Sequence, residues 1–260
     1  MDSLGIDDGS PARPIRQRAA GWLGALLDLA MPPGCLCCGR PMADGGALCP
    51  ACWSAIRWIE RPFCERLAIP FGYDIGPGAL SAEAIANPPP FGRLRAVCVY
   101  GREAGEMVQA LKYHDRTELA RPLGAMMARA LGPIAGEIDL VLPVPLHRGR
   151  LWRRRFNQSA LLGAALAARI GKPFEPQLLA RIRATRQQVG LKAGERARNV
   201  EGAFRVQPAA RPALAGKRVL LVDDVYTTGS TVRAATRALL RGGAASVDVA
   251  VFARVVEGMG

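Results

Sequence analysis

Short apolar blocks along the chain predict buried strands. The runs from Leu94 to Tyr100, from Ile138 to Val144 and from Lys217 to Val222 are rich in apolar residues, and Ser246 to Val255 is similar. Runs of this length and composition are typical of strands that are covered on both faces of a sheet. We therefore expect four strands after residue 93.

Between these strands, apolar residues recur at helical spacing. The spacing predicts helices within Ala104–Leu131, over Arg155–Ile170 and over Ser230–Arg241. We expect Pro122 to divide the first of these segments into two helices. Strands that alternate with helices predict an α/β fold of the kind that has a parallel sheet with helices on both faces.

The remaining segments differ in composition, which predicts the domain boundaries. Residues 1–30 form an N-terminal tail with an amphipathic helix, and residues 31–69 are rich in cysteine. Residues 70–93 contain three consecutive prolines and several glycines, which is typical of a linker. Residues 94–256 hold the predicted α/β domain. Within it, residues 181–203 are basic and poor in apolar side chains, so we expect a mobile loop there.

No stretch is long and apolar enough for a membrane-spanning helix, which needs about 20 residues. The N-terminal candidate from Ala19 to Met31 is interrupted by Asp28, and it follows Asp7 and Asp8, unlike a secretion signal. We expect no membrane insertion and a cytoplasmic location.

The net charge of +13 is concentrated in one part of the chain. Residues 147–198 hold thirteen lysines and arginines against two acidic residues, whereas the rest of the chain is nearly balanced. A positive field of this kind attracts a polyanion. The candidates are a polyphosphate ligand, a nucleic acid, or both in turn.

Two cysteine pairs predict a metal site. Cys35-x-x-Cys38 and Cys49-x-x-Cys52 are separated by ten residues and supply four thiolates, the donor set that tetrahedral Zn²⁺ prefers. Four thiolates leave no open position for a substrate, so the zinc is expected to be structural. Cys37 competes for a place in this set. Cys64 and Cys98 are expected to lie outside it.

The most informative run extends from Val219 to Thr231. Apolar residues lead to two acids, Asp223 and Asp224, and then to a turn of small residues that opens a helix. Backbone N–H groups and hydroxyls of that turn can hold a phosphate at the helix N-terminus. The turn consists of Thr227, Thr228, Gly229, Ser230 and Thr231.

The acids need a separate explanation, because carboxylates repel a phosphate. They are expected to face hydroxyls or a hydrated Mg²⁺, and a phosphorylated ribose offers this arrangement. A strand-end acid pair before an ordinary helix cap is the simpler alternative. A Walker-type P-loop is excluded, because no Gly-Lys-Ser/Thr follows the strand.

The run from Val219 to Thr231 resembles the phosphoribosyl diphosphate-binding motif of type I phosphoribosyltransferases. Together with the cysteine pairs, residues 31–256 resemble the ComF family, also called competence protein F or ComFC. The resemblance implies a type I phosphoribosyltransferase fold, a zinc-binding N-terminal region and a link to DNA uptake in competent bacteria. Further similar blocks are Leu-Lys-Tyr at 111–113, Pro-Val-Pro at 143–145, Phe-Asn-Gln at 156–158, Gln188 to Leu191 and Arg198 to Phe204.

By position, the resemblance implies roles for four groups of residues. Asp223 and Asp224 form the catalytic pair that contacts the ribose hydroxyls or Mg²⁺, and residues 227–231 hold the 5′-phosphate. The loop after the second strand corresponds to the pyrophosphate loop, and residues near 186–200 to a flexible loop that closes over the site. The pyrophosphate-loop candidates are Arg148, Arg150, Arg154 and Arg155, and the flexible-loop candidates are Arg186, Gln188, Lys192 and Arg196. Many members of the family carry Gly where this chain has Arg155.

Residues 147–155 form a basic segment between a strand and a helix, with five arginines around Trp152. The arginines suit a diphosphate, and Trp152 suits stacking on a base. The alternative is a solvated basic turn with Trp152 packed inward. His147 suits either a structural hydrogen bond or proton transfer, and His114 is expected at a helix end.

Two functions remain open. The first is a phosphoribosyltransferase that uses phosphoribosyl diphosphate with Mg²⁺ and transfers the pentosyl group to a small acceptor. The second is a module with little or no turnover that handles single-stranded DNA beside competence or recombination proteins. A purine-salvage transferase is a third candidate. The segment after residue 246 offers only apolar side chains such as Phe252 to an acceptor, so turnover has less support than ligand binding.

Overall fold

A computed structural model describes residues 34–42, 48–113, 116–183 and 202–256. The chain divides into two compact units, residues 1–50 and 51–260, with the boundary inside the short helix α2. The tail expected in residues 1–30 lies outside the described residues, as does most of the expected mobile loop.

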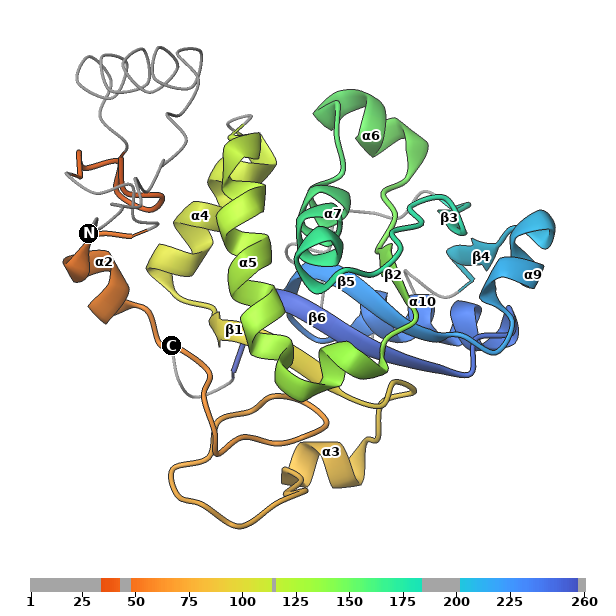
Figure 1. The fold of residues 1–260 in the computed structure, drawn as a ribbon, viewed down its shortest axis with the longest axis horizontal. Helices are drawn as coiled ribbons and strands as arrows, with labels where there is room; N and C mark the ends of the chain where they lie inside the picture. Colours follow the sequence, from red (N-terminus) through yellow and green to blue (C-terminus); the bar gives the residue numbers. More distant parts are fainter. Residues whose placement is uncertain (1–33, 43–47, 114–115, 184–201, 257–260) are drawn as a thin grey trace, which may run out of the picture. The chain divides into compact units, whose positions relative to one another are not determined.

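The second unit contains the helices and strands of the predicted α/β fold (Figure 1). The strands are β1 (Leu94–Val99), β2 (Leu140–Pro143), β3 (Leu179–Arg181), β4 (Phe204–Val206), β5 (Arg218–Tyr226) and β6 (Ser246–Arg254). The α-helices are α2 (Pro50–Ala55), α3 (Ala82–Ala86), α4 (Arg102–Tyr113), α5 (Ala120–Leu131), α6 (Arg148–Arg154), α7 (Gln158–Ile170), α9 (Arg211–Leu214) and α10 (Ser230–Arg241). Short 3₁₀ helices span Thr117–Leu119, Gly132–Glu137 and Pro208–Ala210.

Four parallel strands form the main sheet in the order β1-β6-β5-β2. The four strands expected from the apolar runs are these four, so the predicted α/β fold is confirmed. β3 and β4 pair antiparallel in a separate ribbon, and the segment between them contains residues 184–201, which are not described.

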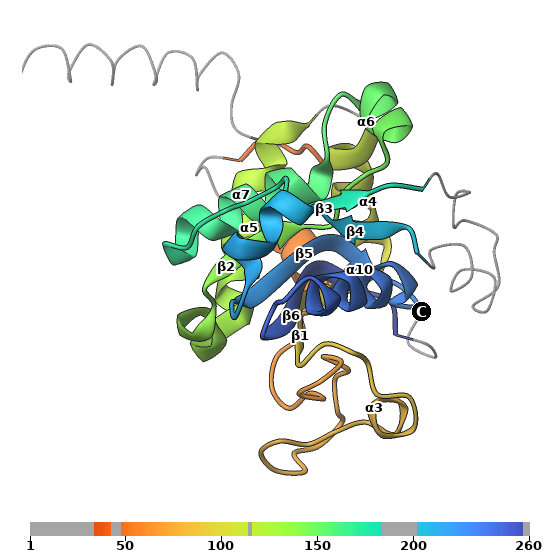
Figure 2. The same ribbon diagram turned by 90° about the vertical axis from the view of Figure 1, so that its right-hand side faces the viewer.

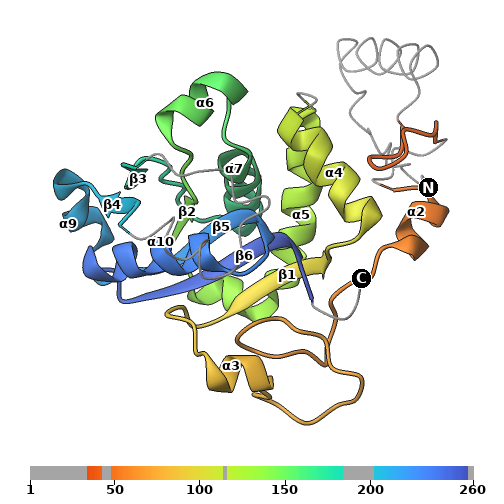
Figure 3. The ribbon, with the colours of Figure 1, turned by 180° about the vertical axis from the view of Figure 1, so that it is seen from behind.

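Helices cover both faces of this sheet. α5 and α7 pack on one face, where Val222 of β5 lies close to Gly163 of α7 (Figures 1 and 2). The view from behind brings α10 to the front (Figure 3). On that face, Val219 and Leu221 of β5 join Leu239 of α10 in one apolar cluster. Successive strand residues point to opposite faces, so each strand must be apolar throughout.

Two of the expected helix boundaries were wrong. The segment within Ala104–Leu131 is interrupted before residue 117, and Pro122 lies in the first turn of α5, where its missing N–H removes no helical hydrogen bond. The helix expected over Arg155–Ile170 begins three residues later, at Gln158. α6 ends at Arg154, and α7 begins after Asn157, whose side chain accepts a hydrogen bond from the Ser159 N–H.

Residues 56–93 pack against the sheet. Near its start, the Ile59 N–H donates to the Val97 carbonyl, and the Val99 N–H donates to the Arg57 carbonyl. Phe91, within the segment expected to be a linker, is buried in the same cluster as α10, at the edge of Tyr226. These residues therefore help to support α10 and the end of β5.

Among the described residues, no helix combines the length and apolar character that a membrane crossing requires.

Candidate functional site

The site predicted from the sequence lies where β2 ends beside β5. β2 pairs with β5 as far as Pro143, which lies opposite Val222, whereas β6 pairs with β5 as far as Tyr226. β5 therefore continues past its β2 partner, and the acid pair lies inside the strand rather than after it. The carboxyl edge of a parallel sheet is where α/β proteins place their ligands.

The two acids have different partners. Asp223 Oδ1 accepts hydrogen bonds from the Ser159 hydroxyl at 2.8 Å and from the Asp224 N–H at 3.0 Å. Asp224 Oδ1 accepts from the Val225 N–H at 2.7 Å, and Asp224 Oδ2 lies 2.6 Å from Lys112 Nζ. The pair is therefore held by α7 on one side and by the end of α4 on the other.

Burial and the neighbouring charge of Asp224 raise the pKa of Asp223 from 3.8 to about 7. The hydrogen bond from Ser159 and the charge of Lys112 act in the opposite direction but do not cancel this effect. Asp223 is thus a carboxyl group that gains or loses its proton near neutral pH.

The turn predicted to hold a phosphate begins directly after β5. Thr227 and Thr228 are exposed, and Thr228 Oγ1 lies 3.0 Å from Ser230 Oγ. Ser230 and Thr231 form the first turn of α10, whose N-terminal N–H groups suit an anion. The structure thus places all five predicted residues in a single turn at a helix N-terminus.

Gly229 is required in this turn for two reasons. Its φ of 73° lies in the left-handed region, and a Cβ at this position would collide with the ring of Tyr226. Tyr226 is in turn packed at the edge of Phe91, with the Arg254 guanidinium 5.4 Å from its ring centre. The sequence did not single out Tyr226, Phe91 or Arg254, because their role is to hold the turn from behind.

The basic segment after β2 forms the helix α6 instead of a loop. His147 caps this helix by accepting a hydrogen bond from the Gly149 N–H, which is the structural role considered for it. Arg155 ends the helix with a φ of 63°, in the left-handed conformation that favours glycine. Many members of the ComF family carry Gly at this position. In this chain Arg155 places a side chain in a turn whose backbone conformation favours glycine.

Trp152 is 87% exposed, so the alternative of an inward-packed tryptophan was wrong. Trp152 lines an open cavity of about 930 Å³ together with Arg148, Leu151 and Arg155. Two of the four pyrophosphate-loop candidates therefore face this cavity.

The end of α4 connects the acid pair to α6. Lys112 pairs with Asp224, and the next residue, Tyr113, accepts a hydrogen bond from Arg154 Nη2 at 2.9 Å and lies under its guanidinium. Sequence reasoning noted Leu-Lys-Tyr at 111–113 only as a block of family resemblance. A lysine at a helix end has no sequence pattern that marks it as part of a site. Its partner Asp224 follows more than a hundred residues later in the chain.

Several predicted residues cannot be placed. The flexible-loop candidates Arg186, Gln188, Lys192 and Arg196 lie outside the described residues, as does His114. Arg150 is in α6, without a described side chain.

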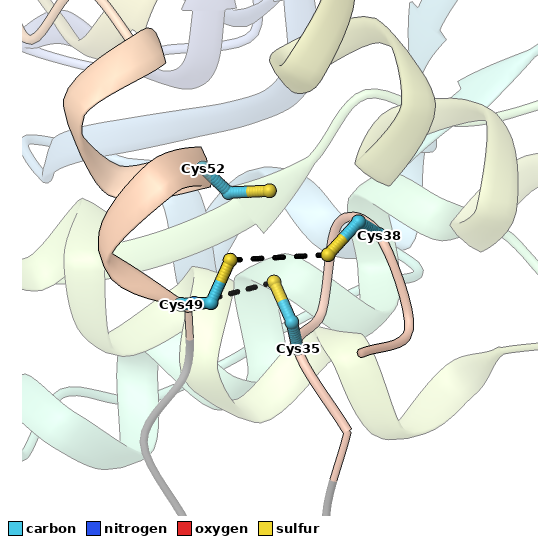
Figure 4. Close-up of side chains that lie close together, drawn as sticks. All are labelled: Cys35, Cys38, Cys49 and Cys52. Atoms are coloured by element: carbon cyan, nitrogen blue, oxygen red, sulfur yellow. Dashed lines mark hydrogen bonds between the residues drawn. The ribbon is translucent and has the colours of Figure 1, made fainter. Parts of the chain in front are cut away.

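The four predicted cysteines come together. Figure 4 shows the sulfurs of Cys35, Cys38, Cys49 and Cys52 turned toward one another, and they lie within 4.8 Å of each other. Cys38 Sγ is 3.8 Å from Cys49 Sγ. Zinc–sulfur bonds of about 2.3 Å at the tetrahedral angle require about this separation. The donor set and its spacing therefore fit a structural zinc ion.

The backbone supports this cysteine cluster. Gly39, with a φ of 71°, allows the tight turn after the first pair, and the Cys49 N–H donates to Cys35 Sγ at 3.3 Å. Burial opposes ionisation of Cys35, but hydrogen bonds from the backbone of Cys49, Cys38 and Cys37 outweigh it and lower the pKa of this thiol to about 6. Cys64 and Cys98 are buried and lie outside the cluster, as expected.

Comparisons with known proteins match both parts of the chain. A double zinc ribbon domain family matches residues 26–85, and a phosphoribosyl transferase domain family matches residues 157–259. DNA utilization protein YhgH of Salmonella typhi is 35% identical over 234 residues, which cover 88% of this chain and 100% of the relative. Competence protein F of Haemophilus influenzae is 26% identical, covering 84% of this chain and 95% of the relative. Competence protein ComFC of Bacillus subtilis is 28% identical, covering 59% of this chain and 61% of the relative.

Removing one zinc ligand is expected to release the metal. Cys38→Ser replaces a thiolate with a hydroxyl, a weak zinc ligand, so zinc content after dialysis against a chelator is expected to fall from about one ion per chain to near zero. Cys37→Ser is the matched control and is expected to retain the metal. Loss of zinc from the Cys37 variant, with retention in the Cys38 variant, would assign the ligand place to Cys37.

The raised pKa of Asp223 predicts a pH-dependent stability. Between pH 4 and pH 7 the folded chain holds a proton that the unfolded chain releases, so the free energy of unfolding falls as the pH rises through this window. One pKa unit corresponds to about 1.4 kcal/mol, so the fall is at most about 4 kcal/mol. Asp223→Asn removes the titrating group and should flatten this part of the profile in urea unfolding. Identical profiles for both proteins would contradict the assignment.

Proposed function

Because the chain belongs to the ComF family of proteins with a phosphoribosyltransferase domain, we propose that it binds phosphoribosyl diphosphate with Mg²⁺ at the carboxyl edge of β5. One observation carries the proposal. Near the end of β5 the acid pair is followed, after Val225 and Tyr226, by a turn of small residues that leads into the N-terminus of α10.

The phosphate and the ribose would occupy different parts of this edge. The turn at residues 227–231 supplies amides and hydroxyls for the 5′-phosphate. Asp223 and Asp224, set back within β5, supply carboxylate oxygens for the ribose hydroxyls. This separation keeps the negative charges of protein and ligand apart.

The diphosphate would lie toward α6. Arg148 and Arg155 line the cavity there, and guanidinium groups bind phosphate oxygens in pairs. The carboxylates of Asp223 and Asp224 are hard oxygen donors of the type that Mg²⁺ prefers. When bound, Mg²⁺ offsets the negative charge that a diphosphate carries as a leaving group.

The acceptor for a transfer reaction is not assigned. Phe252, which the sequence offered as an acceptor contact, is fully buried in β6 and cannot meet a ligand. The proposal is therefore a binding function of a phosphoribosyltransferase fold, with a structural zinc in the N-terminal part.

A second candidate function rests on Trp152. An aromatic ring that is 87% exposed beside Arg148 and Arg155 is suited to stack on a base of single-stranded DNA while the arginines contact phosphates. The name of the Salmonella relative concerns DNA utilization, and the names of two other relatives concern competence. In this function, the surface that carries Trp152, Arg148 and Arg155 would bind a nucleic acid.

Ligand binding is tested by thermal stabilisation. Phosphoribosyl diphosphate with Mg²⁺ at a hundred times its Kd should raise the stability of the protein by about 2.7 kcal/mol. The double variant Asp223→Asn/Asp224→Asn should lose this stabilisation. Asp139→Asn removes a carboxylate from the opposite edge of the sheet and serves as the control. Equal stabilisation of all three proteins would place the ligand elsewhere.

DNA binding is tested with a fluorescent single-stranded oligonucleotide. Trp152→Ala should weaken binding about 5- to 100-fold, because stacking on one base contributes about 1–3 kcal/mol. Tyr73→Ala, which removes another exposed aromatic ring, should leave the affinity unchanged. Binding that is insensitive to Trp152, or to added salt, would rule out this use of α6.

A further inference from the structure

Lys112 lies against the acid pair, and the proposed function assigns it no role. It is the penultimate residue of α4, its side chain is 22% exposed, and its ammonium lies 2.6 Å from Asp224 Oδ2. The Asp224 side chain is only 10% exposed, so this ion pair is largely shielded from solvent.

In this arrangement each oxygen of Asp224 already has a partner. Oδ1 accepts the Val225 N–H, and Oδ2 faces Lys112. A divalent cation that binds Asp224 Oδ2 therefore competes with the positive charge of Lys112 for the same oxygen. Asp223 differs, because both of its described hydrogen bonds end on Oδ1.

The position of Lys112 is set by its neighbours. Ala104, Met107, Val108 and Leu111 bury one face of α4, and Tyr113 is held by Arg154. The backbone at the end of α4 is thus anchored on both sides of residue 112. The long side chain is free to change its rotamer while the helix stays in place, which is what an exchangeable counter-ion requires.

Resting on the proposed function, we propose that Lys112 is a built-in counter-ion for the acid pair that occupies the cation position while the site is free of ligand. Its positive charge compensates the buried Asp224, and it competes with Mg²⁺ for the same carboxylate oxygen. Metal alone is therefore bound weakly. A metal–diphosphate complex, which also gains the phosphate turn and α6, can displace the lysine. This competition would favour the complete ligand over free Mg²⁺.

The test uses Mn²⁺ as a spectroscopic probe for the Mg²⁺ position, with the full chain and its zinc. Lys112→Gln removes the competing charge from a position within a few ångströms of the metal. The affinity for Mn²⁺ alone, measured by electron paramagnetic resonance, should increase about tenfold or more.

Two further variants control for charge and position. Lys172→Gln removes the same charge after the other end of α7, about 20 Å along that helix from Ser159, and should leave Mn²⁺ affinity unchanged. Lys112→Arg keeps the charge and should bind Mn²⁺ as weakly as the native protein does. The part of the Mn²⁺ signal that belongs to this site is the part lost in Asp223→Asn/Asp224→Asn.

Stability provides a second readout. Without metal, Lys112→Gln leaves Asp224 buried without its counter-ion, so its Tm should be lower than that of the native protein. Saturating Mn²⁺ should restore more of the Tm in this variant than in the native protein, since the metal replaces the missing charge.

The outcomes separate this inference from the proposed function. If Lys112→Gln binds Mn²⁺ no more tightly than the native protein, or if no Mn²⁺ signal depends on the acid pair, the counter-ion role is wrong. The proposed function would still stand if phosphoribosyl diphosphate stabilised the native protein and not the double Asp variant. Failure of that second experiment would overturn the proposed function itself.

Discussion

β5 lies between a short strand, β2, and a long strand, β6, and this difference in length determines where the candidate site lies. From Val219 to Val222 this strand is paired on both sides, but β2 ends at Pro143 and only β6 continues to the end of β5. Asp223 and Asp224 therefore belong to a rigid strand and yet have one open side. A buried, hydrogen-bonded strand holds two acids at fixed positions, which a loop would not do.

The charged groups at this edge of the sheet form a connected series of contacts. The acid pair of β5 touches Lys112 of α4, the neighbouring Tyr113 touches Arg154, and α6 continues the positive charge to Arg148 and Arg155. In the proposed function, the hydroxyls of the sugar would meet the acids, and the phosphates would meet amides and guanidinium groups. A polynucleotide would match only the basic part.

The zinc site is separate from this chemistry. Four thiolates complete the coordination of the metal, so its contribution is to hold the cysteine-bearing segments together. Residues 56–93, which follow it, extend the sheet edge at β1 and place Phe91 behind Tyr226 and Gly229. The family membership joins a zinc-binding segment and a phosphoribosyltransferase domain in one chain.

The sequence alone determined the four parallel strands, the turn of small residues that follows the acid pair, and the cluster of four cysteines, because each depends on residues close together in the chain. Apolar runs, a Cys-x-x-Cys spacing and a glycine before a helix are local signals. Only the tertiary structure decided that Lys112 pairs with Asp224, that α6 is a helix that exposes Trp152, and that Tyr226 closes the back of Gly229. These contacts join segments far apart in the chain, and a single lysine, tryptophan or tyrosine has the same local pattern whether it faces a ligand, solvent or the core.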